Sequence, residues 1–285
     1  MKIASILYFS GTGNTLWASD RFAEHLNSKG IKAEAFSIES DQNILKQRIL
    51  ESDIVFLNYP VYSSDRPEIV KDFINHLPDV AHSEGPKEFG IICTQMLYSG
   101  DGAWLEHELI EHKGYEINWA IHLRMPNNVS IPLFPFRSTN DREKLKKILT
   151  KADMRLEALS RSVAAEIAEL TGTSLLSRLM GLIQREPYRK MFPGWRNDMT
   201  IDPFTCTKCG LCIKLCPISN IQFAPEDTGG FPEFNGECNL CLRCYNFCPS
   251  QSILYRTKKY KSIDGSLPYR GPTENFNPMR MKQKK

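Results

Sequence analysis

The feature that most constrains this chain is a pair of matched cysteine runs in its last third. CTKCGLCIKLCP begins at Cys206 and CNLCLRCYNFCP begins at Cys238, and both follow the pattern C-x2-C-x2-C-x3-C-P. The second run lies 32 residues after the first, and the same shift superposes Ile221 on Ile253. The two runs therefore form an internal repeat rather than a coincidence of composition.

The spacing of the repeat predicts iron–sulfur clusters. Three thiolates two residues apart can each reach a different iron of one cubane, whereas the fourth cysteine begins a helical turn that points toward the other cluster. Zinc is the main alternative, but four-cysteine zinc sites generally use two separated C-x2-C pairs, which a triple run fits poorly. We expect one [4Fe–4S] cluster on Cys206, Cys209, Cys212 and Cys248, and a second on Cys238, Cys241, Cys244 and Cys216.

The first half of the chain alternates between apolar runs and helix-like stretches. The strand candidates are KIASILYF, IKAEAFS, DIVFLN, EFGIICT and YEINWAIHL, between Lys2 and Leu123. Helical patterns separate them near residues 13–30, 41–51, 67–77 and 101–113, and a longer pattern covers 140–170. Apolar strands joined by helical crossovers are typical of an α/β fold with a doubly wound parallel sheet, here of five strands.

A loop rich in hydroxyls and glycine follows the first strand, reading SGTGNT over residues 10–15. Its glycines allow the backbone N–H groups to converge, and the next helix adds the positive end of its dipole. No lysine follows, as one would in a nucleoside triphosphatase loop. We therefore predict a loop that holds a monophosphate permanently, and an ordinary strand–helix turn is the alternative.

This loop resembles the phosphate loop of the flavodoxins, whose pattern is Ser/Thr-x-Thr-Gly-x-Thr. The resemblance covers about residues 1–170 and implies a flavodoxin-like sheet of order 2-1-3-4-5 that binds FMN. It also implies that loops 58–67 and 94–102 grip the flavin ring, with tyrosines able to stack on it. The residues expected to bind FMN are Ser10, Gly11, Thr12, Gly13, Asn14, Thr15, Asn58, Tyr59, Pro60, Tyr62, Thr94, Gln95, Tyr98 and Gly100.

The cysteine repeat looks like the bacterial two-cluster ferredoxins over about residues 200–256, which implies a small α+β domain. Together the two halves resemble a family of fused flavodoxin–ferredoxin proteins. The expected division is an FMN domain over 1–170, a linker or interdomain helix over 171–199, a ferredoxin-like domain over 200–270 and a basic tail over 271–285.

Charge is concentrated at the end of the chain. From Arg256 to Lys285 there are nine Lys/Arg against two Asp/Glu, although the whole chain carries only +3. The small net charge argues against a general nucleic-acid binder. The basic end is interpreted either as a solubilising tail or as a docking surface for an acidic partner.

These resemblances imply an intracellular protein that passes electrons between FMN and two [4Fe–4S] clusters, and on to or from a redox partner protein. One alternative is an NAD(P)H- or ferredoxin-dependent flavin reductase acting on a quinone, a disulfide or a small electrophile. Another is a redox or iron sensor that acts through the basic tail. No catalytic residue is assigned, and a homo-oligomer is left open.

The N-terminus does not resemble a signal peptide, and no stretch approaches the ~18 apolar residues of a membrane span. We therefore expect a cytoplasmic protein without a transmembrane segment. In a reducing compartment its cysteines are expected to bind metal rather than form disulfides.

Overall fold

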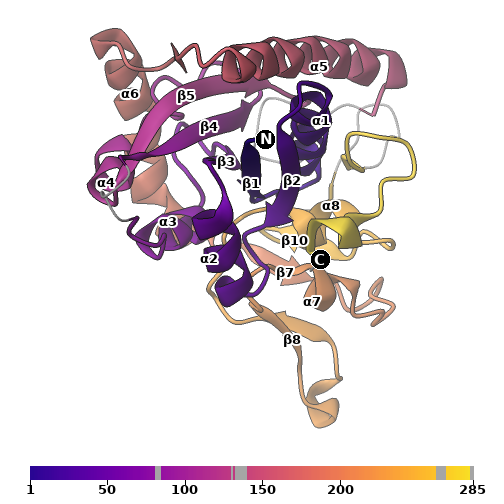
Figure 1. Ribbon diagram of the computed structural model, residues 1–285. Helices are drawn as coiled ribbons and strands as arrows, with labels where there is room; N and C mark the ends of the chain where they lie inside the picture. Colours follow the sequence, from indigo (N-terminus) through magenta and orange to yellow (C-terminus); the bar gives the residue numbers. More distant parts are fainter. Residues whose placement is uncertain (81–84, 130, 132–139, 261–267, 283–285) are drawn as a thin grey trace.

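The computed structural model describes residues 1–80, 85–129, 131, 140–260 and 268–282 of the 285-residue chain. Strands and helices alternate through the first part (Figure 1). In chain order they are β1 (Ile3–Tyr8), α1 (Asn14–Ser28), β2 (Lys32–Ser37), α2 (Gln42–Glu51), β3 (Ile54–Pro60), α3 (Glu68–Asn75), β4 (Lys87–Gln95), α4 (His107–His112), β5 (Tyr115–Arg124) and α5 (Arg142–Ala164).

These strands form one parallel sheet of order β2-β1-β3-β4-β5-β6. The order 2-1-3-4-5 is the flavodoxin-like one, so the expected fold class is confirmed. The expectation of five strands was one short, because β6 (Glu169–Leu170) pairs with Trp119 and Ala120 of β5. A strand of two residues is too short to produce a periodic sequence signal. The long helix predicted over 140–170 is also shorter than expected: it begins at Arg142 and ends at Ala164, before β6.

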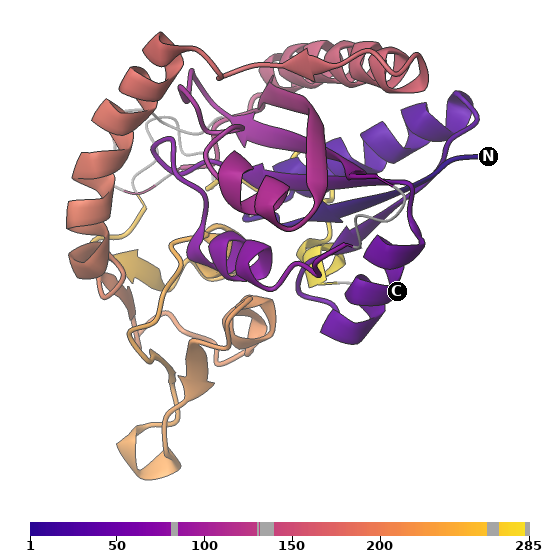
Figure 2. The same ribbon diagram turned by 60° about the vertical axis from the view of Figure 1, so that its left-hand side comes forward.

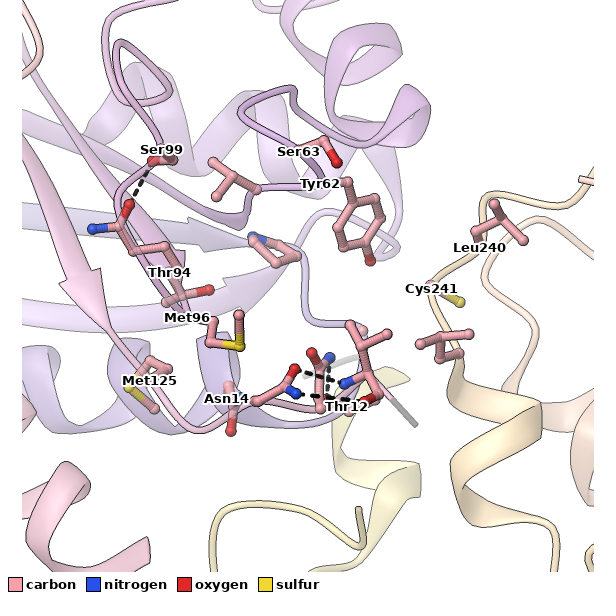
Figure 3. A pocket seen from close by; sticks show the side chains of 18 of the residues that line it. Thr12, Asn14, Tyr62, Ser63, Thr94, Met96, Ser99, Met125, Leu240 and Cys241 are labelled. Carbon is pink, nitrogen blue, oxygen red and sulfur yellow. Dashed lines mark hydrogen bonds between the residues drawn. The ribbon is translucent and has the colours of Figure 1, made fainter. Parts of the chain in front are cut away.

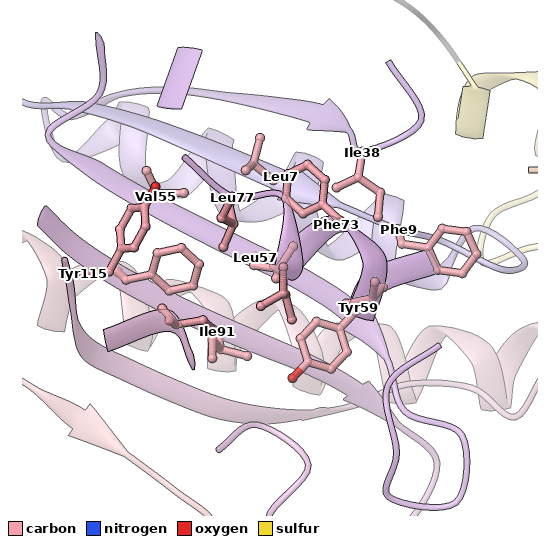
Figure 4. Close-up of a cluster of buried hydrophobic side chains, with 14 of the residues drawn as sticks. Leu7, Phe9, Ile38, Val55, Leu57, Tyr59, Phe73, Leu77, Ile91 and Tyr115 are labelled. Atoms are coloured by element: carbon pink, nitrogen blue, oxygen red, sulfur yellow. The ribbon is translucent and has the colours of Figure 1, made fainter. Parts of the chain in front are cut away.

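Helices cover both faces of the sheet. Residues of α1 and α5, such as Phe22 and Leu156, pack with Trp119 on one face. On the other face, α2, α3 and α4 pack against Leu57 and Ile91 in the cluster drawn in Figure 4. Because both faces are covered, the strands are nearly continuous apolar runs. The carboxyl ends of the strands are left for a binding site.

The last third of the chain forms a small α+β unit below the sheet (Figure 1). Two antiparallel strand pairs, β7 with β10 and β8 with β9, accompany the cysteine runs: β7 precedes both runs and β10 follows them, whereas β8 and β9 lie between them. The elements are β7 (Met199–Ile201), α7 (Leu211–Leu215), β8 (Ile221–Phe223), η2 (Glu226–Thr228), β9 (Pro232–Phe234), α8 (Arg243–Phe247), β10 (Ile253–Tyr255) and η3 (Pro278–Lys282).

Helix α6 (Leu175–Trp195) runs along one side of the molecule, from the sheet toward the small unit (Figure 2). Two ion pairs fasten it to the loops that follow β3 and β4. Arg185 donates to both carboxylate oxygens of the buried Asp101, at 2.8 and 3.2 Å, and Arg189 donates to Asp65 at 2.6 Å. Within the described residues, no helix is both long and apolar enough to cross a membrane.

Candidate functional site

The loop at residues 10–15, named the phosphate loop after its predicted role, lies at the carboxyl end of β1 and is almost completely buried. The hydroxyl of Ser10 accepts a hydrogen bond from the Gly13 amide at 3.1 Å, which closes the turn. Gly13 has a φ of 100°, in the left-handed region that favours glycine. Among the described residues, no side chain caps the first turn of α1, and that turn contains no acidic residue. Its amide groups are therefore available for an anion, which fits the phosphate prediction.

A cavity of about 320 Å³ adjoins this loop, as Figure 3 shows, and it is named the large cavity because it exceeds the two cavities at the cysteines. This volume lies near the lower end of the ~300–1,000 Å³ found for small-molecule sites. The loops after β3 and β4 form two further walls, as the flavodoxin resemblance implied. The predicted residues that line the cavity are Ser10, Gly11, Thr12, Asn14, Thr15, Pro60, Tyr62, Thr94, Gln95 and Tyr98.

Four predicted residues do not line the cavity. Asn58 and Tyr59 are buried in β3, where Asn58 donates to Ser19 at 2.9 Å and Tyr59 donates to the Gly102 carbonyl at 2.9 Å. Gly13 lies under the Phe276 ring, and Gly100 packs on α6. Of the two tyrosines considered for the first ring loop, Tyr62 is therefore the one beside the cavity. Its hydroxyl is buried and has no hydrogen-bond partner among the described residues.

Other cavity walls come from segments that were not predicted to lie beside the loop at 10–15. They belong to the chain after β5, to α6 and to the second cysteine run, and include Met125, Asn127, Asn128, Gln184, Tyr188, Trp195, Leu240, Cys241 and Leu242. No local pattern marks these residues as a set, because they meet only in the folded chain. Asn128 contacts the phosphate loop directly, donating to the Thr12 hydroxyl at 2.7 Å.

The eight repeat cysteines gather around two small cavities in the α+β unit. Cys206, Cys209, Cys212 and Cys248 line one of them, and Cys216, Cys238, Cys241 and Cys244 line the other. Each group is one of the two ligand sets predicted from the spacing. In each group, the first three cysteines of one run therefore meet the fourth cysteine of the other run, as expected for two cubane clusters.

Backbone amides point at the fourth cysteine of each run. The amide of Asn220 donates to Cys216 Sγ at 3.2 Å, and the amide of Ser252 donates to Cys248 Sγ at 3.2 Å. Hydrogen bonds of this kind favour a thiolate and tune an iron–sulfur cluster. The matching pair shows that the repeat extends to the surroundings of the sulfurs.

The donor set suits a cluster better than an isolated thiol. Burial raises the pKa of Cys241 to about 11 and that of Cys238 to about 12, so a bare thiolate would be costly there. A coordinated metal removes this cost. Within the described chain, no three His, Cys, Asp or Glu side chains form a site for a single metal ion. In a cubane, each cysteine binds a separate iron.

The two kinds of site share a wall. Cys241 lines both the large cavity and one of the cysteine cavities. Gly11 approaches the Cys241 carbonyl so closely that an added Cβ would lie 2.8 Å from its oxygen. A side chain at residue 11 would therefore separate the phosphate loop from the second cysteine run.

A buried arginine fastens this contact. Arg243 donates to the Ser10 carbonyl at 3.0 and 2.7 Å and forms an ion pair with Glu39. Burial alone would lower the pKa of Arg243, but the Glu39 carboxylate outweighs it and the pKa is raised. The guanidinium therefore stays charged between the phosphate loop and the second cysteine run.

Comparison with known proteins identifies the α+β unit. Residues 198–249 match the 4Fe-4S dicluster domain family. An uncharacterized ferredoxin of Methanocaldococcus jannaschii is 28% identical over 68 residues, which are 24% of this chain and 88% of that protein. Subunit I of the NAD(P)H-quinone oxidoreductase of Gloeobacter violaceus is 26% identical over 85 residues, which are 26% of this chain but only 40% of that subunit.

Solved structures resemble the sheet-containing part at low similarity. The match to a flavodoxin from the domain Archaea spans 56% of this chain and 98% of the flavodoxin chain, at 14% identity and a TM-score of 0.37. The rubredoxin oxygen:oxidoreductase of Desulfovibrio gigas covers 58% of this chain and 36% of its own, at 13% identity and a TM-score of 0.43. The fold assignment therefore depends on the strand order described above. The chain thus joins a 4Fe-4S dicluster domain, at residues 198–249, to a flavodoxin-like parallel sheet.

Proposed function

We propose that the chain is an electron-transfer flavoprotein that holds FMN in the large cavity and two [4Fe–4S] clusters on the repeat cysteines. The observation that carries the proposal is that Cys241 lines both the large cavity and a cysteine cavity. When bound, the flavin exchanges one or two electrons, whereas each cubane passes one at a time. One chain would then contain a one-to-two-electron converter and a short path for single electrons.

The residues that would hold the FMN phosphate are those of the loop at 10–15. Their support is the uncapped start of α1 and the buried hydroxyls of Ser10, Thr12 and Thr15. Tyr62 and Tyr98 flank the cavity where the ring would lie. The Tyr62 hydroxyl is a buried donor that a bound group could satisfy.

The exposure of the cysteines favours an order of the two clusters along the electron path. Cys241 and Cys244 are buried beside the sheet, whereas Cys209 of the first run is exposed. We propose that electrons pass between the cavity and the cluster on Cys238, Cys241, Cys244 and Cys216, and then to the cluster on Cys206, Cys209, Cys212 and Cys248. A redox partner protein would exchange electrons at the exposed Cys209 side.

A light-driven reduction tests this proposal. The reconstituted protein is illuminated with a photoreductant that acts on flavin, and the cluster signals are followed by electron paramagnetic resonance. We expect the clusters to be reduced at a rate independent of protein concentration, and flavin-free protein to show no such phase. A rate proportional to concentration would mean that electrons pass between chains, contrary to the proposal.

A flavin reductase is the second candidate, and one observation favours it. Leu97 and Tyr98 line the cavity and are about half exposed, at 52% and 51%, so a small molecule can approach this wall. Rapid bleaching of the flavin by NADH or NADPH would support a reductase. Bleaching by dithionite alone would support a carrier that takes electrons from proteins.

A further inference from the structure

The described C-terminal segment, residues 268–282, lies against both parts of the molecule. Tyr269 and Met281 are completely buried, at 0% exposure. Met281 packs with Leu16 of α1 and with Leu215 of α7. Figure 1 shows this segment in yellow, passing from the level of α1 to the cysteine unit. It is therefore packed structure, although its sequence resembles a solubilising tail.

Specific contacts hold the segment at the phosphate loop. The Tyr269 hydroxyl donates to Asn14 Oδ1 at 2.5 Å, and the Phe276 ring covers Gly13. Farther along, Arg280 forms an ion pair with Asp20 of α1 at 2.8 Å. These contacts place the cations of the segment in defined positions.

Two of those cations reach the cysteine runs at equivalent places. Lys282 Nζ donates to the carbonyl of Cys216 at 2.8 Å, and the Arg270 guanidinium donates to the carbonyl of Cys248 at 3.1 Å. Cys216 and Cys248 are the fourth cysteines of the two runs and face different cysteine cavities. Each predicted cluster therefore has its own cation from the same segment.

The Arg270 guanidinium has a further donor. Its Nε is buried and has no hydrogen-bond partner among the described residues. An unpaired buried donor is costly unless another group satisfies it. The unpaired Nε of Arg270 is therefore consistent with a bound group nearby that accepts its hydrogen bond.

We infer that Arg270 and Lys282 are positioning residues that raise the reduction potentials of the two clusters. Reduction adds one electron, and hence one negative charge, to a cluster. A fixed cation nearby stabilises the added charge, and cluster potentials respond to net charge and hydrogen bonding. This inference rests on the cluster assignments of the proposed function.

The inference differs from the two interpretations of a basic tail. A solubilising tail or a docking surface needs cations that are free in solvent, whereas Lys282 and Arg270 are half-buried and donate to backbone carbonyls of the cysteine runs. A sensor that signals through this tail would likewise need the segment to be available to a partner.

Potentiometric titration of the holoprotein, followed by electron paramagnetic resonance, tests the inference. Lys282→Met and Arg270→Met each remove one charge and retain an apolar stem. We expect each variant to lower one midpoint, a different one in each case, and the double variant to lower both. A tenfold change in the ratio of oxidised to reduced cluster at fixed potential corresponds to about 59 mV for one electron. Shifts approaching this size are expected.

Lys258→Met is the matched control, because Lys258 is exposed in the same unit and forms no ion pair among the described residues. It should leave both midpoints unchanged. Lys282→Arg should restore the wild-type midpoint by keeping the charge. Unchanged midpoints in the Met variants, or equal shifts in Lys258→Met, would overturn the inference.

Iron and flavin contents are measured first on every variant. Wild-type protein without two clusters would contradict the proposed function itself. A Met variant that loses iron, while Lys282→Arg keeps both iron and wild-type midpoints, would support a role for the charge. Loss of iron in both Lys282 variants would assign the lysine a packing role and reject the inference.

Discussion

The two copies of the cysteine repeat have the same backbone but different surroundings. Lys208 and Leu240, which are equivalent, have φ values of 53° and 50°, and Gly210 and Leu242 have φ values of 69° and 62°. Yet Cys209 of the first copy is exposed, whereas its equivalent Cys241 is buried against the phosphate loop. The cysteine spacing thus determines the shape of the loop, and the residues between the cysteines decide what it contacts.

Two substitutions between the copies account for much of this difference. Leu211 of the first copy corresponds to Arg243 of the second, which reaches the sheet domain through Ser10 and Glu39. The exposed Lys208 corresponds to Leu240, which lines the large cavity. The first copy therefore faces solvent at Lys208, whereas the second copy packs against the large cavity at Leu240 and against the sheet domain at Arg243.

Removal of one ligand from each copy should have the largest effect and separate their roles. Cys241→Ala and Cys209→Ala should each lose one cluster, or about half of the iron. Light-driven reduction of the remaining cluster should survive in Cys209→Ala and be abolished in Cys241→Ala, because only the second copy adjoins the cavity. Iron analysis and electron paramagnetic resonance provide the measurement. Equal reduction in both variants would show that the copies are interchangeable.

Arg243→Leu makes the second copy resemble the first and leaves Glu39 buried without its partner. Breaking a buried ion pair in this way costs about 3–5 kcal/mol. We expect a loss of that size in the free energy of unfolding, measured with denaturant on reconstituted protein. The double variant Arg243→Leu/Glu39→Leu should be less destabilised than the single one. A loss below about 1 kcal/mol would mean that the pair does not fasten the interface.

Gly11→Ala tests the close approach between the phosphate loop and Cys241. The added methyl would meet backbone, so we expect a loss of about 1–3 kcal/mol in stability, as for overpacking. Displacement of the loop should also weaken FMN binding about tenfold, equivalent to about 1.4 kcal/mol. Fluorescence titration with FMN measures the affinity. Gly194→Ala is the control, since its Cβ meets nothing within 4 Å, and it should bind FMN as the wild type does.

Exchange of Lys208 and Leu240, the second pair of equivalent residues that differ between the copies, should have the smallest effect on stability. Leu240→Lys places a charge at the cavity wall and should reduce stability by about 1 kcal/mol, with weaker FMN binding. The reciprocal Lys208→Leu should cost less, about 0.5 kcal/mol, through the loss of the contact between the Lys208 ammonium and the Phe231 ring and of its hydrogen bond to the Gly229 carbonyl. Thermal unfolding of both variants gives the comparison. Equal losses would contradict the difference in burial between the two copies.

Local patterns were enough to predict most of the fold. Continuous apolar runs marked the five principal strands, and the helices between them indicated parallel crossovers. The strand order came from the family resemblance. The two-residue β6 and the early end of α5 had no periodic signal and were missed. The cysteine sets could be stated in advance because their spacing acts over a few residues, and the structure brings each set to one cavity.

The cavity was less accessible to sequence reasoning. The loops at its rim were predicted, but the alternation of side chains at the end of β3 turns Tyr59 into the core and leaves Tyr62 at the cavity. Gln184 and Tyr188 of α6 reach the same space from more than a hundred residues beyond the loop at 58–67. No local rule links such distant segments.

By itself, the sequence determined the parallel α/β architecture, the hydroxyl- and glycine-rich turn after the first strand and the grouping of eight cysteines into two sets, because each depends on spacing along a short stretch. Only the tertiary structure decided that the second copy adjoins the large cavity, that Arg243 is buried against Ser10, and that Tyr269 and Lys282 hold the end of the chain between the two parts. These contacts join residues up to 255 positions apart. They form only when surfaces complementary in shape and charge are brought together by folding.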